Sequence, residues 1–254
     1  LSSDGSVVAI GAYQNDGGGT YSGHVRIYEN DNGTWTKIGD DIDGESSYDY
    51  SGHSVSLSSD GSVVAIGAYG NDGNGTDSGH VRIYENNNGT WTKIGDDIDG
   101  ESSGDYFGQS VSLSGDGSVV AIGAPRDDAN GSNSGHVRIY ENDNGTWTKI
   151  GDDIDGEADN DYSGWSVSLS SDGSVVAIGA RQNDGGGTYS GHVRIYENDN
   201  GTWTQIGDDI DGESSYDYFG HSVSLSADGS VVAIGAYGND GTSTDAGHVR
   251  IYEN

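Results

Sequence analysis

The 254-residue sequence contains no cysteine, no methionine and a single proline. Without cysteine there can be no disulfides, so a sizeable core has to hold the fold together. No apolar run approaches the length of a membrane-spanning helix, and we therefore expect no membrane insertion. The chain opens inside a repeated unit, so we expect it to be part of a longer protein.

Basic residues are also scarce, because ten Lys and Arg face 42 Asp and Glu, which gives a net charge of −32. Such a charge excludes a nucleic-acid partner bound by neutralising its phosphates, and it disfavours docking on anionic membranes. Hydrophobic residues make up only 31% of the chain. Their β-branched runs nevertheless recur at fixed spacing between Asp-Gly and Asn-Gly turns, which indicates strands rather than disorder.

One phrase, Leu-Ser-x-Asp-Gly-Ser-Val-Val-Ala-Ile-Gly-Ala, begins every 56 residues, at Leu1, Leu57, Leu113, Leu169 and Leu225. A period a little above 50 with four strand-like segments is typical of a propeller blade. In the second repeat we expect strands a to d at residues 53–58, 63–68, 80–85 and 90–94, with strand d extending to 98 in one interpretation. Asn88-Gly89 predicts the hairpin turn between strands c and d.

The sequence therefore predicts an all-β propeller of four-stranded antiparallel blades over residues 1–254, either a single propeller or a segment of a larger propeller or array. The chain holds about 4.5 repeats and eighteen expected strands, or five blades if the incomplete first and last ones are counted. No segment of ten or more residues has helical periodicity.

The glycine-rich phrases at the ends of strands a and b resemble a known family. Phe107-Gly108 precedes strand a, and Gly123-Ala124-Pro125 ends strand b. This resembles the FG-GAP repeat of integrin α-subunits and of large secreted or surface proteins of marine microbes. The resemblance implies a β-propeller, usually of seven blades, an extracellular or cell-surface location, and adhesion or ligand binding, often with calcium.

The calcium loop of that family lies between strands a and b, but here this link is a short turn with one carboxylate, Asp60. One carboxylate cannot supply the six to eight oxygens that calcium takes. The acidic d–a loops are a second candidate for calcium, and the alternative is that their aspartates cap backbone amides. The candidate ligands are Asp41, Asp43, Glu45, Asp49, Asp97, Asp99, Glu101, Asp105, Asp153, Asp155, Glu157, Asp161, Asp209, Asp211, Glu213 and Asp217.

Variation among the repeats gathers in the b–c and d–a loops, which lie at one end of an antiparallel meander. That end is rich in tyrosine, which favours a binding face, although long loops also vary freely without a function. The candidate ligand-binding residues are Tyr13, Tyr21, Tyr48, Tyr69, Trp165, Tyr189, Tyr216 and Tyr237. Trp165 has a second interpretation, as a plug at the mouth of the central channel.

Other side chains recur once per blade. A histidine opens each strand c, as in His80, and we favour a hydrogen bond to a neighbouring loop over a metal site. The strand d tryptophans, such as Trp91, and the strand c tyrosines, such as Tyr84, are expected to pack between blades. Sequons that are either glycan sites or simply turns occur at Asn32, Asn74, Asn88, Asn130, Asn144 and Asn200.

No catalytic motif is recognisable, because nearly every reactive polar residue is copied in each blade, whereas an active site needs a unique convergence of groups. We therefore expect a non-enzymatic extracellular module whose variable end binds a protein or glycan ligand. The alternative is a structural building block of a surface protein or filament, whose partners are copies of itself.

Overall fold

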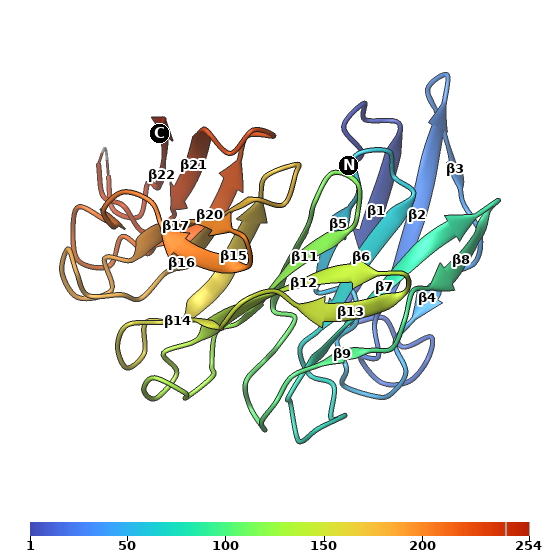
Figure 1. Ribbon diagram of the computed structural model, residues 1–254, viewed down its shortest axis with the longest axis horizontal. Helices are drawn as coiled ribbons and strands as arrows, with labels where there is room; N and C mark the ends of the chain where they lie inside the picture. Colours follow the sequence, from blue (N-terminus) through green and yellow to red (C-terminus); the bar gives the residue numbers. More distant parts are fainter. Residues whose placement is uncertain (242, 254) are drawn as a thin grey trace.

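The computed structural model describes residues 1–241 and 243–253, which form five separate antiparallel sheets (Figure 1). The first contains β1 (Val7–Gly11), β2 (His24–Asp31), β3 (Thr34–Lys37) and β4 (Ile42–Asp43). The second contains β5 (Ser54–Leu57), β6 (Val63–Ala68), β7 (His80–Asn87), β8 (Thr90–Lys93) and β9 (Ile98–Asp99). The third contains β10 (Ser110–Leu113), β11 (Val119–Ala124), β12 (His136–Asp143), β13 (Thr146–Lys149) and β14 (Ile154–Asp155). The fourth contains β15 (Ser163–Leu169), β16 (Val175–Ala180), β17 (His192–Asp199), β18 (Thr202–Gln205) and β19 (Ile210–Asp211). The fifth contains β20 (Phe219–Leu225), β21 (Val231–Ala236) and β22 (His248–Glu253).

Each complete sheet is the expected a-b-c-d meander with one addition. The order β5-β6-β7-β8 follows the sequence, and β9 pairs with the beginning of β7, where Ile98 lies opposite Val81. Strand d therefore ends at Lys93, and the run to residue 98 is interrupted rather than continuous. Because β9 covers the beginning of strand c, it brings the acidic d–a loop next to His80.

The turns between strands form where the sequence predicts them. In the a–b turn Asp60 Oδ1 accepts hydrogen bonds from the backbone amide of Ser62 at 2.9 Å and from the hydroxyl of Ser58 at 2.7 Å. In the c–d turn Asn88 and Gly89 both have positive φ, 52° and 87°. Positive φ at both central residues defines a type I′ turn, whose twist matches that of the flanking strands.

The hydrophobic core lies between successive sheets. Val25 and Ile27 of β2 pack against Val64 and Ile66 of β6, and both isoleucines are 1% exposed. Burying each of these side chains contributes about 1.5–3 kcal/mol. Trp91 closes the outer edge of the same interface, where its Nε1 donates to the backbone oxygen of Ile38 at 3.1 Å. The expected packing of the strand d tryptophans between blades is therefore present at Trp91, Trp147 and Trp203, whereas Trp35 of the first sheet is 44% exposed.

Near the loops, successive sheets approach each other so closely that glycine is required. A Cβ on Gly67, at the end of β6, would overlap the carbonyl oxygen of Gly108 in the next repeat. The same oxygen accepts a hydrogen bond from the hydroxyl of Ser54 at 2.7 Å. Gly108 itself has φ +85°, a backbone conformation that favours glycine.

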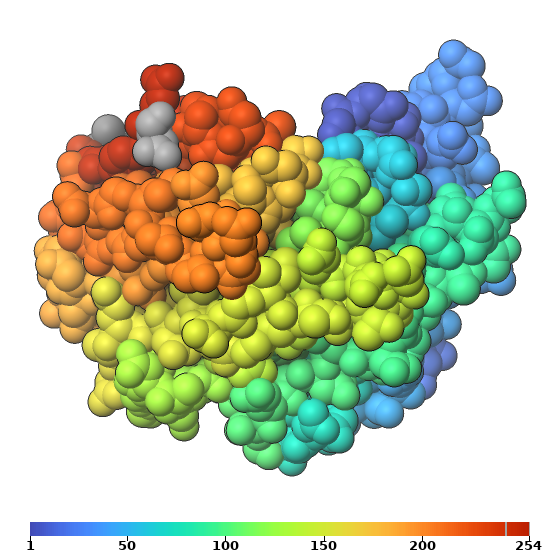
Figure 2. Space-filling view, in the orientation of Figure 1, coloured from blue at the N-terminus to red at the C-terminus, as the bar shows by residue number. Residues whose placement is uncertain are grey.

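The five sheets follow one another around the molecule, with the first strand of each complete sheet innermost. β5, β10, β15 and β20 contact one another in sequence order, and the colours in Figure 2 succeed one another in the same way. At one end the a–b turns are joined by backbone hydrogen bonds that run from Ser3 to Ser59, Gly115, Ser171 and Ala227 in turn, at 2.6–2.8 Å. The chain is therefore an all-β protein of propeller-like architecture.

The first and the last sheet each have a face that no other sheet covers. These faces expose apolar side chains whose equivalents in other repeats are buried. Ile10 of β1 is 51% exposed, whereas its equivalent Ile66 is 1% exposed. Val249 and Ile251 of β22 are 68% and 71% exposed, and their equivalents in the first sheet lie in the core. Among the described residues there is no helix long and apolar enough to cross a membrane.

Candidate functional site

The b–c and d–a loops lie together at the end opposite the a–b turns and are hydrogen-bonded to each other. The backbone amide of Tyr48 donates to Thr20 at 2.8 Å, and that of Tyr50 donates to Tyr21 at 3.1 Å. In the next repeat the amide of Gly104 donates to Thr76 at 2.9 Å. The main chain of one loop thus fixes the other and holds their tyrosines side by side.

A first row of aromatic rings crosses the loops of the first three repeats. Tyr21 stacks on Tyr50 with ring centroids 6.0 Å apart, and Tyr50 stacks on Tyr69 at 5.2 Å and 5°. Tyr69 meets Tyr106 at 5.1 Å, and the guanidinium of Arg126 lies 4.2 Å from the Tyr106 ring centroid. We call these five side chains the first aromatic track. It joins loops that belong to three different sheets.

A second aromatic track occupies the loops of the last two repeats. Its members are Tyr189, Tyr218, Tyr237, His221, Trp165 and Arg181. Tyr218 stacks on Tyr189 at 6.1 Å and on Tyr237 at 5.0 Å, with planes 21° and 4° apart. His221 meets Tyr237 edge-on at 4.7 Å. The guanidinium carbon of Arg181 lies only 3.3 Å from the ring centroid of Trp165.

Several of the tyrosines have a backbone conformation that their side chains disfavour. The tyrosine that ends each d–a loop has positive φ in all four copies, with 55° at Tyr50 and 59° at Tyr106. Tyr48 also has positive φ, 71°, where the next repeat has Gly104 at 88°. For a bulky residue this region is a genuine outlier, and such strain persists mainly where a function maintains it.

All eight predicted ligand-binding residues lie at this end, and five of them are members of a track: Tyr21, Tyr69, Trp165, Tyr189 and Tyr237. The other three each pair with one ring of a track: Tyr13 lies 6.3 Å from Tyr50, Tyr48 lies 5.9 Å from Tyr21, and Tyr216 lies 5.7 Å from Tyr189. Sequence reasoning missed the tyrosine of the Tyr50 type because it is identical in every repeat. A bulky residue repeated in a loop, outside the strand pattern, is the signal that could have found it.

Trp165 takes part in the second track rather than standing alone. It follows the register shift between Ser163 and Ser166 at the beginning of β15, and its half-buried ring lies between Arg181 and His221. Burial lowers the pKa of the Arg181 guanidinium, although the neighbouring Tyr237 opposes this shift. The tryptophan therefore positions a cation within an otherwise aromatic surface.

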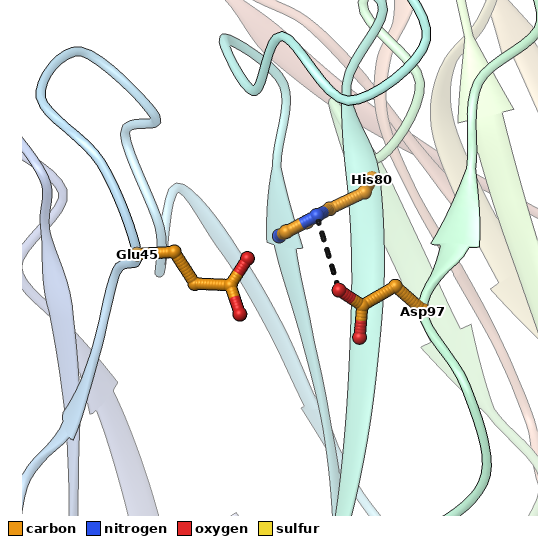
Figure 3. A group of neighbouring side chains, drawn as sticks. All are labelled: Glu45, His80 and Asp97. Atoms are coloured by element: carbon orange, nitrogen blue, oxygen red, sulfur yellow. Dashed lines mark ion pairs between the residues drawn. The ribbon is translucent and has the colours of Figure 1, made fainter.

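The strand c histidine faces carboxylates from two blades. His80 is 2% exposed, and its Nδ1 lies 3.9 Å from Asp97 Oδ2 and 4.0 Å from Asp99 Oδ1. Glu45, from the preceding d–a loop, completes a group whose ligand atoms lie within 4.8 Å of one another (Figure 3). A groove of about 430 Å³ lies over this group and is also lined by Asn71 and Asp72.

The same grouping recurs in the third and fourth repeats, as His136 with Asp153 and Asp155, and as His192 with Glu157 and Asp209. Distances of 3.8–4.0 Å are too long for hydrogen bonds. At His136 the expected contact with a neighbouring loop is an ion-pair contact, because Nδ1 lies 3.2 Å from Oδ1 of Asp127 in the b–c loop. Both of its ring nitrogens are buried and have no hydrogen-bond partner among the described residues.

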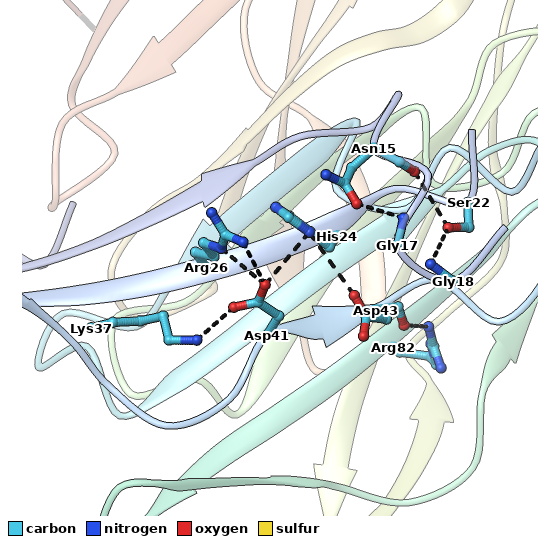
Figure 4. A network of polar contacts seen from close by, with 10 residues as sticks. All are labelled: Asn15, Gly17, Gly18, Ser22, His24, Arg26, Lys37, Asp41, Asp43 and Arg82. Carbon is cyan, nitrogen blue, oxygen red and sulfur yellow. Dashed lines mark hydrogen bonds and ion pairs between the residues drawn. The ribbon is translucent and has the colours of Figure 1, made fainter. Parts of the chain in front are cut away.

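In the first repeat the corresponding aspartate, Asp41, is paired with two cationic side chains (Figure 4). Asp41 accepts hydrogen bonds from Arg26 at 2.8 and 2.9 Å and from Lys37 at 2.7 Å. His24 Nδ1 lies 3.8 Å from the same carboxylate and 3.9 Å from Asp43. The two cations lower the pKa of Asp41 far below its usual range.

In the second repeat Arg82, the equivalent of Arg26, pairs with the preceding d–a loop instead of with Asp97. Arg82 Nη1 pairs with Glu45 Oε1 at 2.9 Å, and its Nη2 donates to the backbone oxygen of Asp43 at 3.0 Å. Lys93 pairs with Oδ1 of Asp97, which leaves Oδ2 facing His80. Burial, helped by Arg82, lowers the pKa of His80 to about 4, so the imidazole is neutral at neutral pH.

The remaining predicted acidic ligands have two different environments. Burial, together with the charges of Asp97 and Glu45, raises the pKa of Asp99. Asp49 instead accepts the backbone amides of Ser46 at 2.8 Å and Glu45 at 3.1 Å. It acts as a cap of the loop, as do its equivalents Asp105, Asp161 and Asp217, each of which accepts at least one backbone amide.

The six sequon asparagines fall into two groups. Asn32, Asn88, Asn144 and Asn200 lie at exposed c–d turns with φ of 51–52°. Asn74 and Asn130 lie in b–c loops and donate to the carbonyl oxygens of Gly100 and Gly156 at 2.9 and 2.7 Å. Every sequon therefore has a local structural role in the turn or loop that contains it.

The repeat matches a known family four times. The FG-GAP repeat is matched at residues 42–84, 98–140, 154–196 and 210–252, each match running from the short fifth strand through the next strand c. The chain belongs to the FG-GAP repeat family. In this chain the close approach of Gly67 to the carbonyl oxygen of Gly108 accounts for the glycine of the Gly-Ala pair that ends strand b. A search of curated proteins finds no match.

Solved structures with a similar fold are propeller-like proteins. Hydrazine synthase from Kuenenia stuttgartiensis is 13% identical with a TM-score of 0.58, over 100% of this chain and 70% of that one. A putative 6-phosphogluconolactonase from Bacteroides uniformis is 12% identical with a TM-score of 0.55, over 99% and 78%. The periplasmic gluconolactonase of Pseudomonas aeruginosa is 16% identical with a TM-score of 0.57, over 91% and 62%. At these identities the likeness concerns the fold alone.

Proposed function

We propose that this chain is a non-enzymatic extracellular recognition module that binds a glycan through the two aromatic tracks. The observation that carries the proposal is the continuous stacking of loop tyrosines from separate sheets, such as Tyr50 on Tyr69 at 5.2 Å. Packing of the core does not need these rings, because they lie beyond the strand ends. Tyrosine offers a large rigid contact surface at low entropic cost.

A glycan suits this surface better than a charged ligand does. The C–H faces of sugar rings stack on aromatic rings, and their hydroxyls take hydrogen bonds from nearby amides and carboxylates. Tyr48 and Tyr237 offer such aromatic faces next to acidic loops, because their side chains are 53% and 50% exposed. The net charge of −32 disfavours anionic ligands and leaves a neutral polysaccharide as the favoured class.

The backbone strain in the loops supports a binding role over free drift. A loop that drifts without selection would replace a tyrosine at positive φ with glycine or asparagine, as at Gly104 and Asn160. Tyr50, Tyr106 and their two equivalents instead remain tyrosine. The non-enzymatic part of the proposal rests on the repetition of reactive groups in every blade.

The proposal is tested by binding of the purified chain to an array of neutral and acidic glycans, with calcium and again with EDTA. We expect binding to a defined neutral glycan, and Tyr69→Ala and Tyr237→Ala should each weaken it about tenfold or more, which corresponds to about 1.4 kcal/mol. Trp35→Ala is the matched control, because Trp35 is a 44% exposed aromatic residue on β3, outside both tracks. Loss of binding in the control as well, or binding to no glycan, contradicts the proposal.

A second candidate function is a structural building block, and the exposed outer faces favour it. Val249 and Ile251 are exposed, whereas the equivalent residues of β2 are buried against β6 of the next sheet. Ile10 is also exposed, and it is the equivalent of Ile66, the β6 residue in that buried contact. The two faces of different copies can therefore pack against each other in a head-to-tail contact. Sedimentation velocity tests this candidate: concentration-dependent growth that Val249→Asp abolishes supports it, and a monomer at all concentrations contradicts it.

A further inference from the structure

We infer that the histidine and carboxylate groups between successive blades are binding sites for a divalent transition metal of the zinc class. The complete sites are centred on His80, His136 and His192, one per repeat. They differ in place from the a–b turn, where Asp60 is the only carboxylate and is bonded to Ser58 and Ser62. This inference does not depend on the proposed glycan binding.

The geometry of the His80 site is close to that of a bound ion. Ligands of tetrahedral zinc, at about 2.0–2.2 Å from the metal, lie roughly 3.4 Å from each other. His80 Nδ1 is 3.9 Å from Asp97 Oδ2 and 4.0 Å from Asp99 Oδ1. Small side-chain rotations of the two aspartates therefore complete the shell. Glu45, whose side chain is 48% exposed, comes from the preceding blade and is held beside the site by Arg82 Nη1 at 2.9 Å.

A buried histidine whose ring nitrogens make no hydrogen bond is the second observation that points to a ligand. The side chain of His136 is 2% exposed, and neither ring nitrogen has a hydrogen-bond partner among the described residues. Its Nδ1 faces Asp153, Asp155 and Asp127, whose Oδ1 is 3.2 Å away without hydrogen-bond geometry. A buried polar atom left without a hydrogen bond is destabilising, and a metal ion at Nδ1 gives that one of the two ring nitrogens a partner.

The charges around the site leave room for a cation. At His80 three carboxylates, from Glu45, Asp97 and Asp99, face the two cations of Arg82 and Lys93. The lysine takes Oδ1 of Asp97 and leaves Oδ2 open towards the imidazole. Cations that hold the second oxygen of a ligating carboxylate are an ordinary outer shell of metal sites.

The ligand set selects the kind of metal. Calcium takes six to eight oxygens, and a neutral imidazole next to two or three carboxylates does not supply them. Imidazole nitrogen suits zinc and its neighbours in the transition series, and mixed histidine and carboxylate sets occur in zinc sites. The site therefore favours Zn²⁺ over Ca²⁺.

Native mass spectrometry and calorimetry of the EDTA-treated chain, with ZnCl₂, MnCl₂ and CaCl₂ in turn, test the inference. We expect three zinc ions per chain and at least tenfold weaker binding of calcium. Asp99→Asn should weaken one of the three zinc ions by about 10–100-fold. The side chain of Asp99 is 37% exposed, and circular dichroism of the variant establishes that it is folded before binding is measured.

Two further variants make the test specific. His192→Gln should remove a different single ion, whereas Asp31→Asn, in an exposed turn, should remove none. No zinc binding, calcium binding as tight as zinc binding, or a zinc count unchanged in both Asp99→Asn and His192→Gln would overturn the inference. Glycan binding measured with and without zinc shows separately whether the two functions are linked.

Discussion

Tyr50 and Tyr69 lie with their ring planes 5° apart and their centroids 5.2 Å apart, although they come from two different loops. Tyr50 ends a d–a loop at φ +55°, and Tyr69 begins the next b–c loop. An offset aromatic stack contributes about 0.5–1.5 kcal/mol beyond the burial of its area. The left-handed backbone at Tyr50 costs an amount of the same order, so the pair adds little net stability and is better explained by binding.

The first prediction separates binding from stability at Tyr48. Tyr48→Gly should leave the free energy of unfolding unchanged or raise it by up to about 1 kcal/mol, because glycine occupies positive φ without strain. The same change should weaken glycan binding, because it removes a 53% exposed ring beside Tyr21. Urea unfolding and glycan titration of one preparation measure both quantities. A clear loss of stability would contradict the strain argument.

The second prediction compares one repeat position in two environments. Ile66→Ala should lower the free energy of unfolding by about 2–5 kcal/mol, because it leaves a cavity between two sheets. Ile10→Ala, at the equivalent but 51% exposed position, should cost less than about 1 kcal/mol. Denaturant unfolding of the two variants side by side provides the measurement. Equal costs would show that the face of β1 is covered in solution.

The third prediction concerns acid unfolding. Hydrogen bonds from the amide and hydroxyl of Ser6 lower the pKa of Asp4 to about 2, and bonds from Ser226 and Ser230 do the same for Asp228. Since the folded pKa is lower than the unfolded one, their contribution to stability is present above pH 4 and is lost as pH falls towards 2. Carbon-detected NMR titration should find both carboxyls ionised at pH 3.

Burial shifts the pKa of the loop aspartates in the opposite direction. It raises the pKa of Asp105 and Asp161, so each protonated carboxyl favours folding below pH 4 and loses that contribution as pH rises through the raised value. The same titration should therefore find these two groups protonating at higher pH than Asp4. The reverse order would contradict the assignment of the two classes of aspartate.

The blade pattern was predictable from sequence because its signals are local. Asp60-Gly61 and Asn88-Gly89 determine their turns within four residues, and the alternation of apolar residues determines the strands between them. The two-residue strand at Ile98 was not predictable, since it forms only because Val81 of another strand lies opposite. Expected strand ends shifted by one or two residues for the same reason.

The candidate sites were predictable only in part. The variable tyrosines indicated the end of the molecule at which the aromatic tracks lie, but the positive φ of Tyr50, whose amide donates to Tyr21, contradicts the preference of tyrosine. The histidine groups draw Glu45 from one repeat and His80 from the next. Repeats compared position by position do not reveal which residues of successive blades meet.

The most direct test of the account is a glycan array probed with the wild-type chain and with the double variant Tyr69→Ala/Tyr237→Ala, which interrupts both aromatic tracks. Circular dichroism first establishes that both proteins have the same β-sheet content. The account predicts that the wild type binds a defined neutral glycan and that the double variant loses this binding while staying folded. Equal binding by the two folded proteins, or binding by neither, would contradict it.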